Sequence, residues 1–75
     1  MIYYKGFGIE PRPGCLASGN YTLNVTVFRF ESHQVTSYPF STNNEFREKA
    51  TAVWHCLRFA MLVIEGQVSN CSVIG

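Results

Sequence analysis

The chain contains no aspartate, only two lysines and no long uncharged hydrophobic run. Without aspartate it lacks a common metal ligand and a common catalytic base. Its net charge is +1, from six basic and five acidic residues, so it has no electrostatic footprint for nucleic acid or an anionic membrane. The most apolar window, AVWHCLRFAMLVI, is too short to span a bilayer and carries His55 and Arg58. We therefore expect neither a nucleic-acid partner nor a membrane partner.

Cysteine is scarce and unpatterned. Cys15, Cys56 and Cys71 are odd in number and form no C-x-x-C pair, which argues against a disulfide framework. Together with His33 and His55 they show no spacing typical of a zinc site. The opening MIYYKGFGIEP lacks the basic head, apolar run and small-residue cleavage site of a secretory signal. We expect a soluble, cytoplasmic protein that holds no metal and no other cofactor.

Hydrophobic residues make up 47% of the chain, which is enough for a packed core in one small domain spanning residues 1–75. Residues 2–10 predict a first strand that ends at a proline-containing loop. Residues 21–31 predict a second strand because they are rich in β-branched and aromatic side chains. Residues 35–40 predict a third strand, and Pro39 places it at an edge of the sheet because proline cannot donate to a ladder.

A helical period follows the strands. Thr42-Asn43-Asn44-Glu45 matches a capping box, and Gly66 is a natural helix end. Between them, apolar residues recur at the spacing of one helix face: Phe46, Ala50, Val53, Leu57, Ala60 and Ile64. The tail QVSNCSVIG adds a short fourth strand or stays irregular. The sequence therefore predicts an α+β fold, a three-stranded antiparallel β-meander followed by one long C-terminal helix packed on one face (β-β-β-α).

The stretch TVFRF, residues 26–30, breaks the alternation of the second strand. Upstream of it apolar side chains occupy odd positions, and then Phe28 and Phe30 occupy even ones. One extra residue near Val27, a β-bulge, restores the phase, buries both phenylalanines beneath the helix and turns Arg29 to solvent. Leaving a phenylalanine exposed forfeits about 1.5–3 kcal/mol of burial, a large loss for so small a domain. We therefore predict the bulge.

No motif indicates catalysis. Cys56 follows His55, but neighbours in a helix point about 100° apart and do not face each other. The chain has no G-x-S-x-G elbow, and its GFG lacks the third glycine and the following helix of a phosphate-binding loop. The glutamates are far apart in sequence and are typical of solvated surface charges. We expect a protein that is not an enzyme.

The predicted helix carries a second apolar seam beside the first. Its members again share helical spacing: Ala52, Cys56, Phe59 and Val63. One sheet covers only one seam, and we expect it to take the first, which has more and larger side chains. The second seam is then covered either by the tail, through Val68, Val73 and Ile74, or by a partner. In the partner case this seam, helped by Val68 and Ile74, forms a symmetric homodimer with Phe59 as its anchor.

The segments YKGFGIEP and LVIEGQV resemble an outline shared by small uncharacterised bacterial sheet-plus-helix proteins, a domain of unknown function. That outline comprises Tyr-x-Gly, an Ile-x-Pro strand end and a final helix closing near Ile-Asp/Glu-Gly. The matching residues are Tyr4, Gly6, Ile9, Pro11, Ile64, Glu65 and Gly66. The resemblance implies a compact sheet-plus-helix fold and no assigned activity, and it supplies no catalytic residue. The segment STNNEF departs from the outline, in which the helix cap lies closer to Glu-Ala.

Two hypotheses about function follow. The first is a small non-enzymatic protein-interaction module that binds protein, often itself as a homodimer. The alternative is a nucleic-acid-binding regulator that uses the outer sheet face, where Phe28 and Phe30 stack on bases and Arg29 neutralises phosphate. The low net charge and the scattered arginines count against the alternative.

Overall fold

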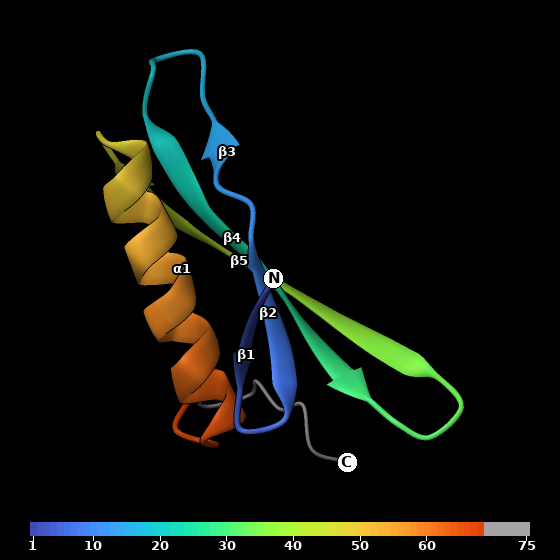
Figure 1. Ribbon diagram of the computed structural model, residues 1–75. Coiled ribbons are helices and arrows are strands. Elements are labelled where there is room, and N and C mark those ends of the chain that lie inside the picture. The colour runs from blue at the N-terminus through green and yellow to red at the C-terminus, as the bar shows by residue number, and fades with distance from the viewer. Residues whose placement is uncertain (69–75) are drawn as a thin grey trace.

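The computed structural model describes residues 1–68, in which five strands precede one helix (Figure 1). The elements are β1 (Ile2–Tyr4), β2 (Phe7–Pro11), β3 (Gly14–Cys15), β4 (Tyr21–Phe30), β5 (Val35–Phe46) and α1 (Lys49–Ile64). All the pairings are antiparallel. β4 is central, with β2 and β3 along one edge and β5 along the other, and β1 lies outside β2. The α+β class and the C-terminal helix are confirmed, but three strands were too few.

The predicted first strand is in fact a hairpin. β1 and β2 pair from Tyr4 opposite Phe7, so Lys5 and Gly6 form a two-residue turn between them. Both turn residues have positive φ, +48° and +86°, as the common two-residue hairpin turn requires. The expectation of one continuous strand is wrong because Gly6 supplies a turn conformation at no steric cost.

The loop after β2 contains a short strand that the sequence did not predict. In β3, Gly14 lies opposite Thr22, and a Cβ atom on Gly14 would come within 2.7 Å of the Thr22 hydroxyl oxygen. A side chain at this position would therefore hold the two strands apart. The connection back to β4 is a tight loop in which the amide of Leu16 donates to the carbonyl of Asn20 at 2.8 Å.

β4 runs without the predicted bulge. Leu23, Val25 and Val27 are buried on one face, and the unbroken pairing with β2 and β5 puts Phe28 and Phe30 on the opposite face. The prediction failed because it assumed that the helix covers the whole strand. Figure 1 shows that the distal end of the β4–β5 hairpin extends away from α1. Beyond Val27 the large apolar side chains of β4 therefore lie on the face of the sheet opposite α1.

A bulge does occur, but in β5 and at the other end of the sheet. Thr22 lies opposite Glu45 and Asn24 opposite Ser41, so Leu23 alone faces the segment 42–44. The predicted capping box therefore belongs to a strand. The Thr42 hydroxyl accepts a hydrogen bond from the amide of Asn44 at 3.3 Å instead of capping a helix.

The two ends of α1 differ in how they are capped. α1 begins at Lys49, and its N-cap Glu48 is extended and makes no side-chain capping hydrogen bond. At the other end Gly66 has φ +75° and donates its amide to the carbonyl of Val63, while the amide of Gln67 donates to Leu62. This pair of bonds is a Schellman motif, in which glycine is favoured. The prediction of Gly66 as the helix end is confirmed.

The helix packs on the sheet through residues of both predicted seams. The buried helix residues are Ala52, Cys56, Ala60, Val63 and Ile64. All of these except Ala52 form one core cluster with Ile9, Leu23, Val25 and Val27 of the sheet. Alanine and cysteine let the helix backbone approach closely enough for the Cys56 thiol to donate to the carbonyl of Asn24 at 3.3 Å. In the first seam Ala50 is exposed and Val53 and Leu57 are half-buried. Ala60 and Ile64 of the same seam are buried, so the sheet takes the C-terminal part of the first seam. The expectation that the second seam stays free is wrong, because Ala52, Cys56 and Val63 are buried as well.

Candidate interaction surfaces

The seam proposed as an interface is largely enclosed within one chain. Ala52 and Cys56 are fully buried and Val63 is 1% exposed, so none of the three offers surface to a partner. Phe59 is half-buried and its ring meets that of Phe40 edge-on at 6.0 Å. Val68 is also half-buried and packs against the core. Ile74, the last residue of the predicted interface, lies outside the described residues, as do Val73 and Cys71.

The predicted nucleic-acid surface is divided between the two faces of the sheet. Phe28 and Phe30 share one face, whereas Arg29 lies on the other, opposite Phe7. The Arg29 guanidinium forms an ion pair with Glu31 at 3.4 Å. The three residues therefore do not combine into one aromatic and cationic surface.

An exposed apolar cluster gathers on the sheet face opposite α1, and we call it the aromatic face. Its members are the exposed residues Met1, Tyr3, Phe30 and Val35 and the half-buried Phe28. The ladder sets Tyr3 opposite Gly8 and Gly8 opposite Phe28, which aligns three strands in one row. The Tyr3 and Phe30 rings lie 5.9 Å apart at 37°. Tyr3 is 70% exposed, so the cluster is open to solvent.

Gly8 makes the aromatic face compact. A Cβ atom there would meet the Met1 sulfur at 2.5 Å and two Phe30 ring atoms at 3.1 Å. Because glycine has no side chain, the ring of Phe30 lies directly on the β2 backbone. The only sequence signal for this arrangement is a glycine between aromatic strands, which often marks a close approach. The contribution of Met1 and Tyr3 depended on the unpredicted β1–β2 turn.

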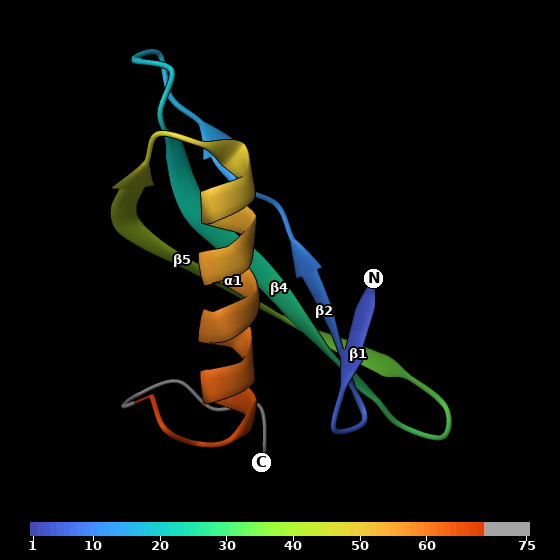
Figure 2. The same cartoon turned by 60° about the vertical axis from the view of Figure 1, so that its left-hand side comes forward.

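A second feature is a shallow cleft between α1 and the bulged part of β5, which we call the β5 cleft. It has a volume of about 180 Å³ and is lined by Leu23, Asn44, His55, Arg58, Phe59 and Leu62. Figure 2 shows the C-terminal end of β5 curving away beside the N-terminal part of α1. No sequence pattern predicts the cleft, because Asn44 falls in the segment that matches a helix cap, whereas His55 and Arg58 lie on the helix itself.

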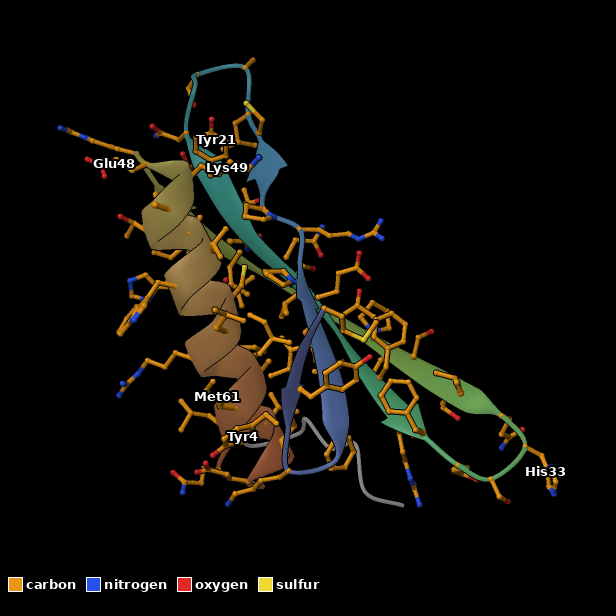
Figure 3. All side chains as sticks on the ribbon, in the orientation of Figure 1. Tyr4, Tyr21, His33, Glu48, Lys49 and Met61 are labelled. Carbon is orange, nitrogen blue, oxygen red and sulfur yellow. The ribbon has the colours of Figure 1, made fainter. Side chains whose placement is uncertain are left out.

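Two titratable groups are perturbed, and each has a structural cause. The Tyr4 hydroxyl donates to the Glu65 carboxylate, which raises the pKa of the phenol. Figure 3 shows Tyr4 beside the C-terminal part of α1, so this bond ties the first strand to the end of the helix. Burial raises the pKa of the Cys56 thiol. Neither group is a nucleophile with a base at hand, because Cys56 donates only to a backbone carbonyl.

Two further observations concern residues 1–68. No group of three or more histidine, cysteine or glutamate side chains is placed to hold a metal ion within this range. Its one helix is neither long enough nor apolar enough to cross a membrane.

The fold and its surfaces define a small α+β domain with an antiparallel sheet, one covered face and one open face. Comparison with known protein families, curated proteins and solved structures finds no match for this chain.

Proposed function

We propose that this chain is a non-enzymatic protein-interaction module that self-associates through the aromatic face. The observation that supports the proposal is the exposed cluster around Gly8 on the face of the sheet that α1 leaves open. Large apolar side chains gathered on a surface usually mark an interface. The surface differs from the helix seam inferred from the sequence, because that seam is used within the chain.

The energetics favour a cluster that acts as a unit. Burying one exposed phenylalanine or tyrosine stabilises by about 1.5–3 kcal/mol, whereas association costs at least about 4 kcal/mol in lost freedom of motion. A single ring would not suffice. In a contact around a two-fold axis, each residue contributes once from each copy. The burial free energy of Tyr3, Phe30 and their neighbours, summed over both copies, then exceeds that cost.

A second copy is the partner that the charges favour. Glu10 lies on the same face of β2 as Gly8, and its carboxylate accepts hydrogen bonds from Arg12 at 2.6 and 3.1 Å. This charge is therefore already paired when an identical surface approaches. Like charges set against each other would otherwise oppose a symmetric contact.

Sedimentation velocity at micromolar concentration tests the proposal. We expect a concentration-dependent dimer that Tyr3→Glu and Phe30→Glu each convert to a monomer, because either change buries a charge at the contact. Trp54→Glu is the matched control, since Trp54 is 55% exposed on α1, away from the aromatic face. A wild-type chain that stays monomeric throughout, or a dimer unaffected by both aromatic-face changes, contradicts the proposal. Circular dichroism establishes that each variant is folded.

Nucleic-acid binding is the alternative, and one observation favours it. Open sheet faces that carry exposed rings can stack on bases, and Tyr3 and Phe30 form such a pair. Against it, Arg29 lies on the other face and Arg12 is paired with Glu10. A salt-sensitive, sub-micromolar complex of the wild-type chain with single-stranded RNA or DNA would favour the alternative over self-association.

A further inference from the structure

The bulge in β5 shapes the β5 cleft. Because Leu23 alone faces three residues of β5, the strand departs from its regular pairing at this point. The departure leaves the Leu23 side chain as part of the cleft lining, with Asn44 on one side and α1 on the other. The cleft is therefore a product of local backbone geometry.

The size of the cleft limits what it can hold. Its volume of about 180 Å³ is below the roughly 300–1,000 Å³ of sites for drug-sized ligands. Leu23, Phe59 and Leu62 give it an apolar floor. A single branched aliphatic side chain matches both the volume and the chemistry of this floor.

The rim of the cleft is polar and held in place by stacked rings. His55 stacks on Phe46 with ring centres 4.6 Å apart and planes at 17°, and it meets Trp54 edge-on at 4.9 Å. The Arg58 guanidinium lies over the Trp54 ring at 5.7 Å. These contacts restrict the side chains before a ligand arrives, which reduces the entropy lost on binding.

The rim also carries the positive charge of the Arg58 guanidinium, which favours an anionic ligand. Within residues 1–68, no carboxylate lies within ion-pair distance of Arg58. Glu45 is close in sequence to Asn44, but it lies on the opposite face of β5 from Phe46 and accepts a hydrogen bond from Asn20 at 3.2 Å. Arginine binds carboxylates through two parallel N–H groups, which fixes their orientation.

We propose that the β5 cleft binds the C-terminal residue of a partner peptide. The residue places a branched aliphatic side chain on the Leu23–Phe59–Leu62 floor and its terminal carboxylate against Arg58, with the Asn44 amide available to the peptide backbone. An apolar group and a carboxylate on one residue match the adjoining floor and rim. This site is separate from the aromatic face, so the inference does not depend on self-association.

Fluorescence anisotropy with labelled synthetic hexapeptides tests the inference on the full chain. The first peptide ends in leucine with a free carboxylate, the second is its C-terminal amide, and the third ends in glycine with a free carboxylate. We expect the first to bind saturably and the other two to bind about tenfold more weakly or worse, since each lacks one of the two contacts. Equal binding of the acid and the amide would overturn the proposal, as would no binding of the leucine acid.

Substitution of the rim arginine locates the site. Arg58→Gln should remove the preference for the acid over the amide, whereas Arg29→Gln, the same change on the distal hairpin, should leave it intact. An Arg58 variant that keeps the full preference would contradict the assignment. Free 4-methylpentanoate supplies the same chemistry without a peptide. If 4-methylpentanoate displaces the peptide and binds as tightly as the peptide does, the rest of the peptide contributes nothing to affinity. The ligand is then a small acid and the peptide assignment is wrong.

The two functional proposals can fail separately. Phe30→Glu should abolish the dimer and leave peptide binding unchanged, while Arg58→Gln should do the reverse. Loss of both properties in either variant would show that one surface serves both, and that result would overturn the assignment of peptide binding to the β5 cleft.

Discussion

Gly8→Ala is expected to destabilise the wild-type chain and to stabilise a chain that lacks the Phe30 ring. Alanine is normally better than glycine inside a strand by about 0.5–1 kcal/mol. Here the added methyl group meets Phe30 ring atoms at 3.1 Å and the Met1 sulfur at 2.5 Å. Met1 can swing aside, but the Phe30 ring is packed against Tyr3. Overpacking of this kind costs about 1–3 kcal/mol, which outweighs the strand preference and leaves a net loss of about 1 kcal/mol.

In a Phe30→Ala background the obstructing ring is gone, and the same substitution should raise the free energy of unfolding by about 0.5–1 kcal/mol. Urea unfolding of the four chains at one protein concentration measures the coupling. Gly14→Ala is the control, because its added atom meets Thr22 at 2.7 Å and should cost the same in both backgrounds. If the effect of Gly8→Ala is identical in both backgrounds to within about 0.5 kcal/mol, the proposed packing of Phe30 on Gly8 is wrong.

Three further predictions concern the helix and its attachment. Glu65 raises the pKa of Tyr4 above 10.0, so their hydrogen bond contributes stability below pH 10 that is lost as the pH rises through the folded-state pKa. In Glu65→Gln, the tyrosinate absorbance of Tyr4 should appear at a lower pH than in the wild-type chain. Cys15 is exposed and Cys56 buried with a raised pKa, so a thiol reagent should label Cys15 at once and Cys56 only as the chain unfolds; rapid labelling of Cys56 in native conditions would contradict its burial. Gly66→Ala should lower the free energy of unfolding by about 1 kcal/mol, since φ is +75°; an unchanged urea midpoint would count against this helix end.

The features that could be predicted from sequence depend on residues with one strong local preference. Gly66 ends the helix because glycine adopts positive φ without steric cost. Pro39 lies in β5, which pairs with β4 and with no other strand among residues 1–68, as expected of an edge strand. The division of residues 2–10 by Lys5 and Gly6 was equally local, but a lysine at positive φ gives no sequence signal.

The features that could not be predicted depend on tertiary context. Both helix seams have the same period, and the buried face combines Ala60 and Ile64 of the first with small residues of the second, such as Cys56, that let the backbone approach the sheet. Treating the seams as alternatives and ranking them by side-chain size missed this combination. The position of Phe30 likewise depended on Gly8 of another strand and on where α1 stops covering β4. The β5 cleft required a bulge whose residues match a helix cap in sequence.

The form of β5 limits how large an assembly of this chain can grow. An unpaired strand edge is a template on which further copies can add without end, as in fibrils. Along β5, Pro39 has no amide hydrogen to donate, and the bulge at 42–44 breaks the repeat that an added strand would have to follow. Growth by strand addition is therefore blocked on this side of the sheet. The proposed contact through the aromatic face, in contrast, would close around a two-fold axis and stop at two copies.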